Sequence, residues 1–272
     1  HGRIGGWGGG AVSPSVDFVE VIANSWYGHV VGPNRHVGVS VDLFIHTWNR
    51  GNGDDLIDHF FSDARARMHE APLRHLDKVR SQHLSLSRVL TLAASENNSV
   101  SSTTLVFLSR VDILFHNHIW ARDFDAKRLY FAELCMQDFS TPVSAPIACK
   151  GGKADFMTHY HIKRNGPKHF RSIDRGSSVW VNDHFFLSNF TVARTFEKIY
   201  TNFSAMRKSL GGFQLWTHYF WPLHVERAGL ASMVSFRIML GINYTIARWR
   251  YKVQEERQDH LLLTTDPVNF ST

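Results

Sequence analysis

An arginine and an aspartate stand two residues apart near the end of the apolar run "LVFLSRVDILF", residues 105–115. Buried strands of α/β proteins are near-continuous apolar runs, and buried arginine and aspartate side chains are rare unless they are paired. Alternate residues of a strand point to one face, so Arg110 and Asp112 are predicted to lie together. Asp112 can hold a hard cation, and the Arg110 guanidinium can bind phosphate oxygens in a fork. The pair indicates either a diphosphate site or a structural ion pair.

A second acidic pair, Asp123 and Asp125 in "ARDFDAKRLYF", is an alternative cation site. No apolar strand runs into this pair, which follows "HNHIW" and precedes a predicted strand. Aspartates in such a position commonly form turns. We therefore expect Asp112, rather than this pair, to be the cation ligand.

Histidines offer further ligands, although a chain with 17 of them brings some together by chance. His116 and His118 follow Asp112 and share a face if the strand continues, so they could complete a metal site with it. His218, in the aromatic segment "LWTHYFWPLH", could ligate a metal or donate to a diphosphate. Its alternative interpretation is a core histidine among aromatic rings.

One further carboxylate, Asp183 in "VNDHFFLSN", interrupts an apolar run with strand alternation. Alternation places Asp183 on the face of its apolar neighbours, where an unpaired carboxylate is costly. A polar catalytic cavity would explain the exception, and a carboxylate in such surroundings can act as a general base. A turn aspartate is the alternative.

The elements that position these residues alternate along the chain. Apolar residues at helical spacing predict helices over 16–31, 54–66, 76–96, 191–210 and 213–230. Runs rich in β-branched and aromatic residues predict strands over 37–48, 103–115, 127–134, 177–189 and 241–253. This interleaving favours an α/β domain with a mostly parallel sheet, whose ligands bind at the carboxyl ends of the strands.

The order of five short motifs resembles a group of small glycosyltransferases that build capsule, surface and viral glycans. The motifs are "VDLFIHTWN", "KVRSQHLSLSRVL", "LVFLSRVDILF", "KRLYFAEL" and "VNDHFFLSN". The resemblance covers about residues 41–190, with weaker agreement to about residue 229. It implies the GT-A fold, a Rossmann-like nucleotide-sugar domain, in which Arg110-Val111-Asp112 stands where most members carry the metal-binding D-x-D.

The resemblance also implies roles for single residues. The donor would contact Arg110, Asp112, Gln82, Arg88 and Asp42, with His46 and Ser85 beside them. Asp183 matches the acidic position before two aromatic residues and would be the base. The aromatic segment 213–221 would provide an acceptor platform through Trp216 and Trp221, because sugars pack their C–H faces on rings.

Composition limits the other classes. The chain has 272 residues, a formal net charge of +6 and two cysteines, Cys135 and Cys149, which form either one disulfide or two buried thiols. No stretch is long and apolar enough for a transmembrane segment, and nothing resembles a nucleic-acid-binding module. A G-x-S-x-G elbow and a G-x-G-x-x-G turn after a strand are both absent from the sequence, which disfavours serine hydrolases and Rossmann dehydrogenases.

The sequence thus predicts a single GT-A-like α/β domain over 1–272, with 1–140 mainly binding the nucleotide sugar and 141–272 mainly on the acceptor side. We expect transfer of a sugar from a nucleotide sugar, preferably a UDP-sugar, to an oligosaccharide or glycoprotein hydroxyl, with Mn2+ or Mg2+ as cofactor. A non-catalytic carbohydrate- or nucleotide-binding protein and a histidine-based metal-dependent hydrolase are the alternatives. For each of these functions we expect a soluble domain, in the cytoplasm or in the secretory-pathway lumen.

Overall fold

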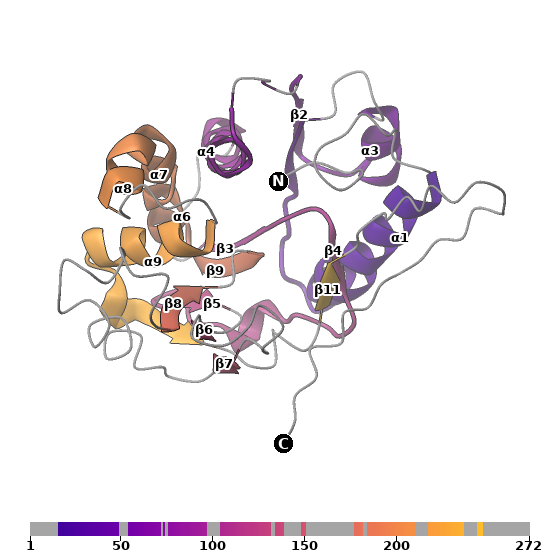
Figure 1. The fold of residues 1–272 in the computed structure, drawn as a ribbon. Helices are drawn as coiled ribbons and strands as arrows, with labels where there is room; N and C mark the ends of the chain where they lie inside the picture. The colour runs from indigo at the N-terminus through magenta and orange to yellow at the C-terminus, as the bar shows by residue number, and fades with distance from the viewer. Residues whose placement is uncertain are drawn as a thin grey trace, which may run out of the picture. The chain divides into compact units, whose positions relative to one another are not determined.

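The computed structural model describes residues 16–48, 54–71, 73, 76–96, 104–131, 134–138, 148–150, 177–181, 184–209, 217–236 and 244–246. Helices and small sheets interleave there, which confirms the α/β class in its coarse form (Figure 1). The chain divides into two compact units: unit 1 is 1–73, 110–123 and 242–272, and unit 2 is 74–109 and 124–241. Each unit draws on both predicted sequence halves.

Unit 1 combines short helices with two two-stranded sheets. Its helices are α1 Val16–Trp26, the π-helix η1 Tyr27–Val31, α2 Gly32–His36, α3 Asp54–Phe60 and the 3-10 helix η2 Ala121–Asp123. Its strands are β1 Phe44–Thr47, β2 Ala66–His69, β4 Ile113–Phe115 and β11 Tyr244–Ile246. β1 and β2 are parallel, whereas β11 and β4 are antiparallel. The parallel pair therefore brings two carboxyl ends to one edge.

One apolar cluster forms the core of unit 1. Its buried members come from α1, β1, α3, the loop after α3 and the segment around β4: Val19, Ile22, Ala23, Ile45, Ile57, Phe61, Ala64, Val111 and Leu114. The helical spacing of the α1 members explains why this segment is a helix, since they form one apolar stripe that requires burial. The cluster joins segments that lie far apart in the sequence.

The helix predicted over 16–31 continues without interruption from α1 into the π-helix η1. A Cβ atom at Gly32 would lie 2.6 Å from the carbonyl oxygen of Tyr27, so the end of η1 requires a glycine there. Pro33 follows at the start of α2, where a missing N–H group costs nothing. Such π-helical turns are frequent at functional sites.

Among the described residues, unit 2 contains the larger sheets and the longest helix. Its helices are α4 Lys78–Glu96, α6 Phe190–Thr195, α7 Glu197–Thr201, α8 Phe203–Ser209, α9 Thr217–Arg227 and the 3-10 helix η4 Ala231–Met233. Its strands are β3 Leu105–Ser109, β5 Leu129–Phe131, β6 Leu134–Asp138, β7 Ala148–Lys150, β8 Ser177–Val181, β9 Phe185–Asn189 and β10 Val234–Phe236. They form one sheet of order β10-β5-β9-β3 and another of order β7-β6-β8.

Aromatic side chains fill the core of unit 2. Trp221 of α9 has none of its surface exposed, and its ring centre lies 5.3 Å from that of Phe186 and 5.7 Å from that of Phe196. Asn189 caps α6, because its side-chain oxygen accepts from Val192 N at 2.8 Å. The four-stranded sheet and the following helices are thus held by one aromatic cluster.

The described sheets differ from the predicted mostly parallel one. Only β1–β2 and β10–β5 are parallel among the described strand pairs, and the other five pairs are antiparallel. Two predicted strands are each a pair of strands with different partners: β3 and β4 over 103–115, and β8 and β9 over 177–189. Alternation therefore does not run continuously through either segment, because polar residues interrupt both.

The two cysteines occupy facing positions in a small sheet. Cys135 of β6 is the register partner of Cys149 of β7 in an antiparallel ladder. Opposed Cα atoms in such a ladder are about 4.5–5.5 Å apart, which overlaps the spacing that a disulfide requires. The backbone register is thus compatible with either predicted alternative.

Candidate functional site

The predicted Arg110–Asp112 contact is present in unit 1. Arg110 Nε donates to Asp112 Oδ1 at 2.8 Å, and Nη2 donates to Oδ2 at 2.5 Å. This is the forked geometry of a guanidinium on a carboxylate, with both side chains partly buried. The two side chains lie together as predicted, although Asp112 belongs to the turn between β3 and β4 rather than to a strand.

Val111 fixes this turn to the core of unit 1. Its side chain is buried and belongs to the same cluster as Ile45 of β1 and Leu114 of β4. Arg110 and Asp112 flank Val111 in the chain. The packing of Val111 in the apolar cluster of unit 1 therefore fixes the backbone of both charged residues. Two motifs more than sixty residues apart in the sequence are thus anchored in one compact unit.

The carboxyl ends of β1 and β2 carry a polar cluster. His46, fully buried, has its Nε2 3.0 Å from Glu70 Oε2. Thr47 Oγ1 lies 3.0 Å from His69 Nδ1, and His69 Nε2 lies 3.1 Å from Asp58 Oδ1. Because parallel strands end at the same edge, these side chains gather there. This edge is where open α/β sheets bind ligands.

The direction of these hydrogen bonds follows from donor chemistry. A carboxylate oxygen only accepts, so His69 Nε2–H donates to Asp58, and in a neutral ring Nδ1 then accepts from the Thr47 hydroxyl. The Thr47 side chain is fully buried, whereas those of Glu70 and Asp58 are 28% and 47% exposed. A ligand at this edge would therefore meet the two carboxylates, of which Glu70 is held by His46 and Asp58 by His69.

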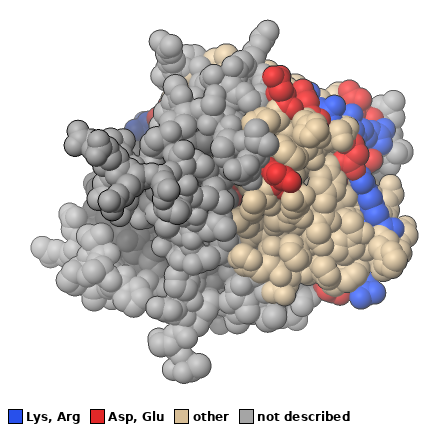
Figure 2. Space-filling model, turned by 90° about the vertical axis from the view of Figure 1, so that its right-hand side faces the viewer, with Lys and Arg blue, Asp and Glu red and all other residues tan. Residues whose placement is uncertain are grey.

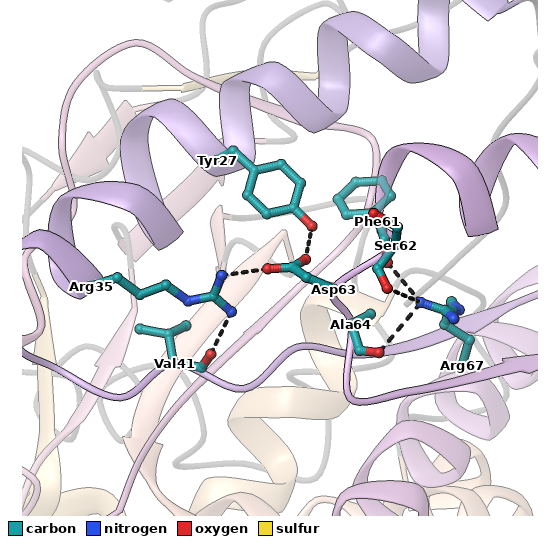
Figure 3. A network of polar contacts seen from close by, with 8 residues as sticks. All are labelled: Tyr27, Arg35, Val41, Phe61, Ser62, Asp63, Ala64 and Arg67. Carbon is teal, nitrogen blue, oxygen red and sulfur yellow. Dashed lines mark hydrogen bonds and ion pairs between the residues drawn. The ribbon is translucent and has the colours of Figure 1, made fainter.

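An arginine holds the loop that leads into β2. Arg67 Nη1 donates to the carbonyl oxygens of Phe61, Ser62 and Ala64 at 2.8, 3.2 and 3.3 Å (Figure 3). Its Nε forms an ion pair with Asp58 Oδ1 at 2.8 Å. The same carboxylate accepts from His69, so Arg67 links this loop to the polar cluster at the strand ends.

A second network ties this loop to η1 and α2. Asp63 accepts hydrogen bonds from the Tyr27 hydroxyl and from Arg35, and Arg35 Nη2 donates to the carbonyl of Val41 at 2.8 Å (Figure 3). Burial raises the pKa of the Tyr27 hydroxyl, and the bond to Asp63 and its charge raise it further. Burial alone would raise the pKa of Asp63, but the bonds from Tyr27 and Arg35 and the Arg35 charge hold it below its usual value.

Charged side chains on the visible surface are largely intermixed. Figure 2 shows basic and acidic side chains beside one another near one edge of the described surface, and a broad area without charge. Unit 1 contains the exposed ion pairs Arg35–Asp63 and Arg65–Asp42, the latter at 2.9 Å. Asp42, predicted to contact the donor, thus lies just before β1 and pairs with Arg65.

The other predicted residues are distributed as follows. Gln82 and Arg88 lie on α4 in unit 2, partly buried and exposed respectively. Trp221 is a core residue and presents no surface to an acceptor. His218 is a position on α9. Asp183 and Trp216 lie outside the described residues.

The alternative acidic pair forms a turn. Asp125 Oδ1 accepts from Lys127 N at 2.9 Å, and Asp125 N donates to the Tyr130 hydroxyl at 2.9 Å. Asp123 ends the 3-10 helix η2 and is exposed. The predicted turn role of Asp125 is therefore confirmed.

Sequence reasoning missed Asp58, His69 and Glu70. The signal was available in "ARMHE", a short stretch ending in a histidine and a carboxylate. Its meaning depends on the β1–β2 register, which pairs Thr47 with His69 and which no local pattern reveals.

Comparison with known proteins adds no identity: no family model matches the chain, and no curated protein matches it. Within the described part of the chain, no three His, Cys, Asp or Glu side chains are already gathered as a metal-binding group. None of the described helices is both long and apolar enough to cross a membrane.

Proposed function

We propose that this chain is a nucleotide-sugar glycosyltransferase that uses unit 1 to bind the donor. The observation that supports the proposal is the common core under the Arg110–Asp112 turn and β1, since Val111 and Ile45 belong to one cluster. It holds an arginine–aspartate fork and the polar ends of two parallel strands in one unit, and these groups suit a diphosphate-linked sugar. The GT-A fold is part of this proposal.

Arg110 would bind the diphosphate of the donor. A guanidinium has five N–H donors, so its two bonds to Asp112 are compatible with phosphate contacts through other N–H groups. Asp112 holds the guanidinium plane in place through both carboxylate oxygens. The pair thus presents an oriented fork, which suits phosphate recognition better than a rotating ammonium would.

Asp112 would also contribute one carboxylate to Mn2+ or Mg2+. Each of its oxygens can accept more than one contact, and a hard cation takes its remaining oxygen ligands from phosphate and water. When bound, the cation would stabilise negative charge on the leaving diphosphate. The partly exposed carboxylate of Glu70 and the exposed carboxylate of Asp58 would contact hydroxyl groups of a ligand at the β1–β2 edge.

The acceptor side of the proposal rests on the sequence. Asp183 would take the proton from the acceptor hydroxyl, and Trp216 would pack against a sugar ring. Trp221 has no part in this proposal, because it is buried among Phe131, Phe186 and Phe196.

A non-catalytic binding protein is the second candidate. Its supporting observation is the closed Arg110–Asp112 fork itself, in which each charge already has its partner. Such a protein would bind a nucleotide or a sugar at the same edge without cleaving the donor. Slow donor hydrolysis without acceptor separates the two candidates, because only a transferase activates the sugar–phosphate bond.

Calorimetric titration of UDP and GDP with and without Mn2+ tests the donor site. We expect Arg110→Lys and Asp112→Asn each to weaken binding about tenfold or more in the presence of Mn2+, since charged hydrogen bonds contribute about 1.5–3 kcal/mol. Arg194→Lys is the matched control, because Arg194 also pairs with a carboxylate, Glu197, at 2.6 Å. Equal affinities for all four proteins would place the site elsewhere.

Asp183→Asn tests the reaction rather than the site. We expect donor affinity to stay within about twofold and transfer to fall about 100-fold or more, the usual contribution of a general base. The two quantities are measured on the same preparation, with release of nucleoside diphosphate as the readout. Transfer within a few-fold of the parent would mean that Asp183 is not the base.

A further inference from the structure

The sequence contains five Asn-x-Ser/Thr motifs, which accept an N-linked glycan in a secretory compartment. They begin at Asn97, Asn189, Asn202, Asn243 and Asn269. The structure describes two of these asparagines, Asn189 and Asn202, and both belong to unit 2. An attached glycan is bulky and hydrophilic, so the folded chain must hold the modified side chain at its surface. The surroundings of the two asparagines therefore indicate which of them can carry a glycan.

Asn189 is built into the fold through both polar atoms of its side chain. Its Nδ2 donates to the carbonyl of Ala126 at 2.7 Å, and its Oδ1 accepts from Val192 N at 2.8 Å, where it caps α6. The residue is partly buried and ends β9, where its register partner is Leu105 of β3. A sugar on Nδ2 would need space beside the Ala126 carbonyl, so a glycan at Asn189 would disrupt this packing.

Asn202 is exposed and lies in the turn between α7 and α8. Its backbone N–H donates to the carbonyl of Lys198 at 3.0 Å, and its own carbonyl accepts from Met206 N at 2.9 Å. Phe203, the middle residue of the motif, is buried, and its ring stacks on that of Phe220 with 4.7 Å between the ring centres. These contacts hold the turn without using the Asn202 side chain, so a glycan there would leave them intact.

We propose that Asn202 is an N-glycosylation site of the folded chain and that Asn189 is not. Ser204, the third residue of the motif, is exposed as well. In the reaction, Asn202 Nδ2 bonds to the anomeric carbon of a sugar on a lipid diphosphate. The sugar–oxygen bond breaks, its electron pair leaves with the diphosphate, and Nδ2 releases one of its two protons. The facing positions of Cys135 and Cys149 are compatible with the disulfide that a secretory compartment also permits.

Secretion of the full chain from a eukaryotic cell, behind a cleavable leader, tests the site. Enzymatic removal of an N-linked glycan converts the modified asparagine to aspartate, which mass spectrometry detects. Trypsin separates the two motifs, since cleavage after Lys198 and Arg207 leaves Asn202 in peptide 199–207, and Asn189 falls in peptide 176–194. We expect the conversion in peptide 199–207 of most secreted chains, and none in peptide 176–194.

Two variants and a control make the test specific. Asn202→Gln and Ser204→Ala should each abolish the conversion in peptide 199–207, because Ser204→Ala keeps the asparagine and destroys only the motif. Thr201→Ala should leave it at the parent level, as Thr201 is an exposed hydroxyl residue beside Asn202 but outside the motif.

Three results would overturn the proposal: an unmodified Asn202 in the secreted parent, conversion that persists in Ser204→Ala, or a glycan on Asn189 of the secreted, folded chain. The proposal does not depend on the donor site of unit 1. Calorimetric affinity for UDP should be the same in Ser204→Ala as in the parent, so failure here is distinguishable from failure of the proposed function.

Discussion

The β1–β2 edge of unit 1 and the β5–β9 centre of the sheet in unit 2 carry different side chains. In unit 1 the ends of β1 and β2 carry His46, Thr47 and His69, whose hydrogen bonds lead outward to Glu70 and Asp58. In unit 2 the central strands β5 and β9 carry Phe131 and Phe186, whose rings contact that of Trp221 on α9. The β1–β2 edge therefore carries hydrogen-bonded polar groups, while β5 and β9 carry aromatic rings that pack on a helix of their own unit.

The difference shows where this chain can hold polar groups without a large loss of stability. Buried polar groups are costly unless each has a partner, and unit 1 supplies such partners through paired strand ends and forked arginines. Aromatic packing in unit 2 supplies stability instead, through burial of large rings and edge-to-face contacts. We expect mutations in unit 2 to change stability first, and mutations at the unit 1 edge to change binding first.

Truncation of Trp221 gives the largest expected effect. Trp221→Ala removes the largest side chain that is fully buried among the described residues, and it should lower the free energy of unfolding by about 3–5 kcal/mol. Urea denaturation followed by far-UV circular dichroism measures it. Val37→Ala is the control, because Val37 is 45% exposed and should lose less than about 0.5 kcal/mol. A loss below 1 kcal/mol for Trp221→Ala would contradict the view that aromatic packing stabilises unit 2.

Acid should weaken unit 2 through His224. Burial and the nearby Lys198 charge lower the pKa of His224 from 6.5 to about 4 in the folded chain. Between these two values the unfolded state binds the proton and the folded state does not, so the free energy of unfolding falls as the pH is lowered from 6.5 toward 4. The full loss from this group is about 3 kcal/mol.

His224→Gln isolates this contribution, since its side chain does not titrate. The Thr195 hydroxyl donates to the Val192 carbonyl at 2.7 Å, so its oxygen accepts from His224 Nε2–H at 3.0 Å, a role that a glutamine amide can take. Denaturant titrations at pH 7 and pH 4.5 should show a smaller pH effect in the variant. Equal pH effects in the two proteins would contradict the neutral, buried state of His224.

A methyl group at Gly32 should disturb unit 1 alone. Gly32→Ala places a Cβ 2.6 Å from the Tyr27 carbonyl oxygen, so the π-helical turn must shift, at a cost of about 1–3 kcal/mol. Gly28→Ala is the matched control in the same turn, where a Cβ meets nothing within 4 Å. Equal stabilities of the two variants, measured by urea denaturation, would exclude a close-packed turn.

Helices and strands were predictable where the pattern is local. The apolar stripe of α1 and that of α4, with His83, Leu86 and Leu90 buried, both follow helical spacing in the sequence. Strand ends were not predictable, because "LVFLSRVDILF" reads as one strand and is two. The turn at Val111 and Asp112 arises because β3 pairs with β9 whereas β4 pairs with β11. Both partner strands lie far away in the sequence.

Only those contacts of the candidate site that join residues close in sequence were predictable. Arg110 and Asp112 are two residues apart, so their contact follows from short-range geometry. The His46–Glu70 and His69–Asp58 contacts depend on the parallel register of β1 with β2. Long-range pairings of this kind leave no periodic signal in one sequence.

The smallest expected effect concerns the Tyr27–Asp63–Arg35 network, where the two charged side chains are 38% and 39% exposed. Solvent screens such a pair, so Asp63→Asn should lower the free energy of unfolding at pH 7 by less than about 1 kcal/mol. The pKa of Asp63 is held below its usual 3.8, so its contribution is present above pH 3.8 and is lost as the pH falls through the lowered value. Asp55→Asn, at an exposed aspartate of α3, is the control.

Denaturation at pH 7 and pH 3 should show a smaller difference between the two pH values in Asp63→Asn than in the parent or the control. A loss of 2 kcal/mol or more at pH 7 would mean that this network, rather than the apolar cluster, dominates unit 1.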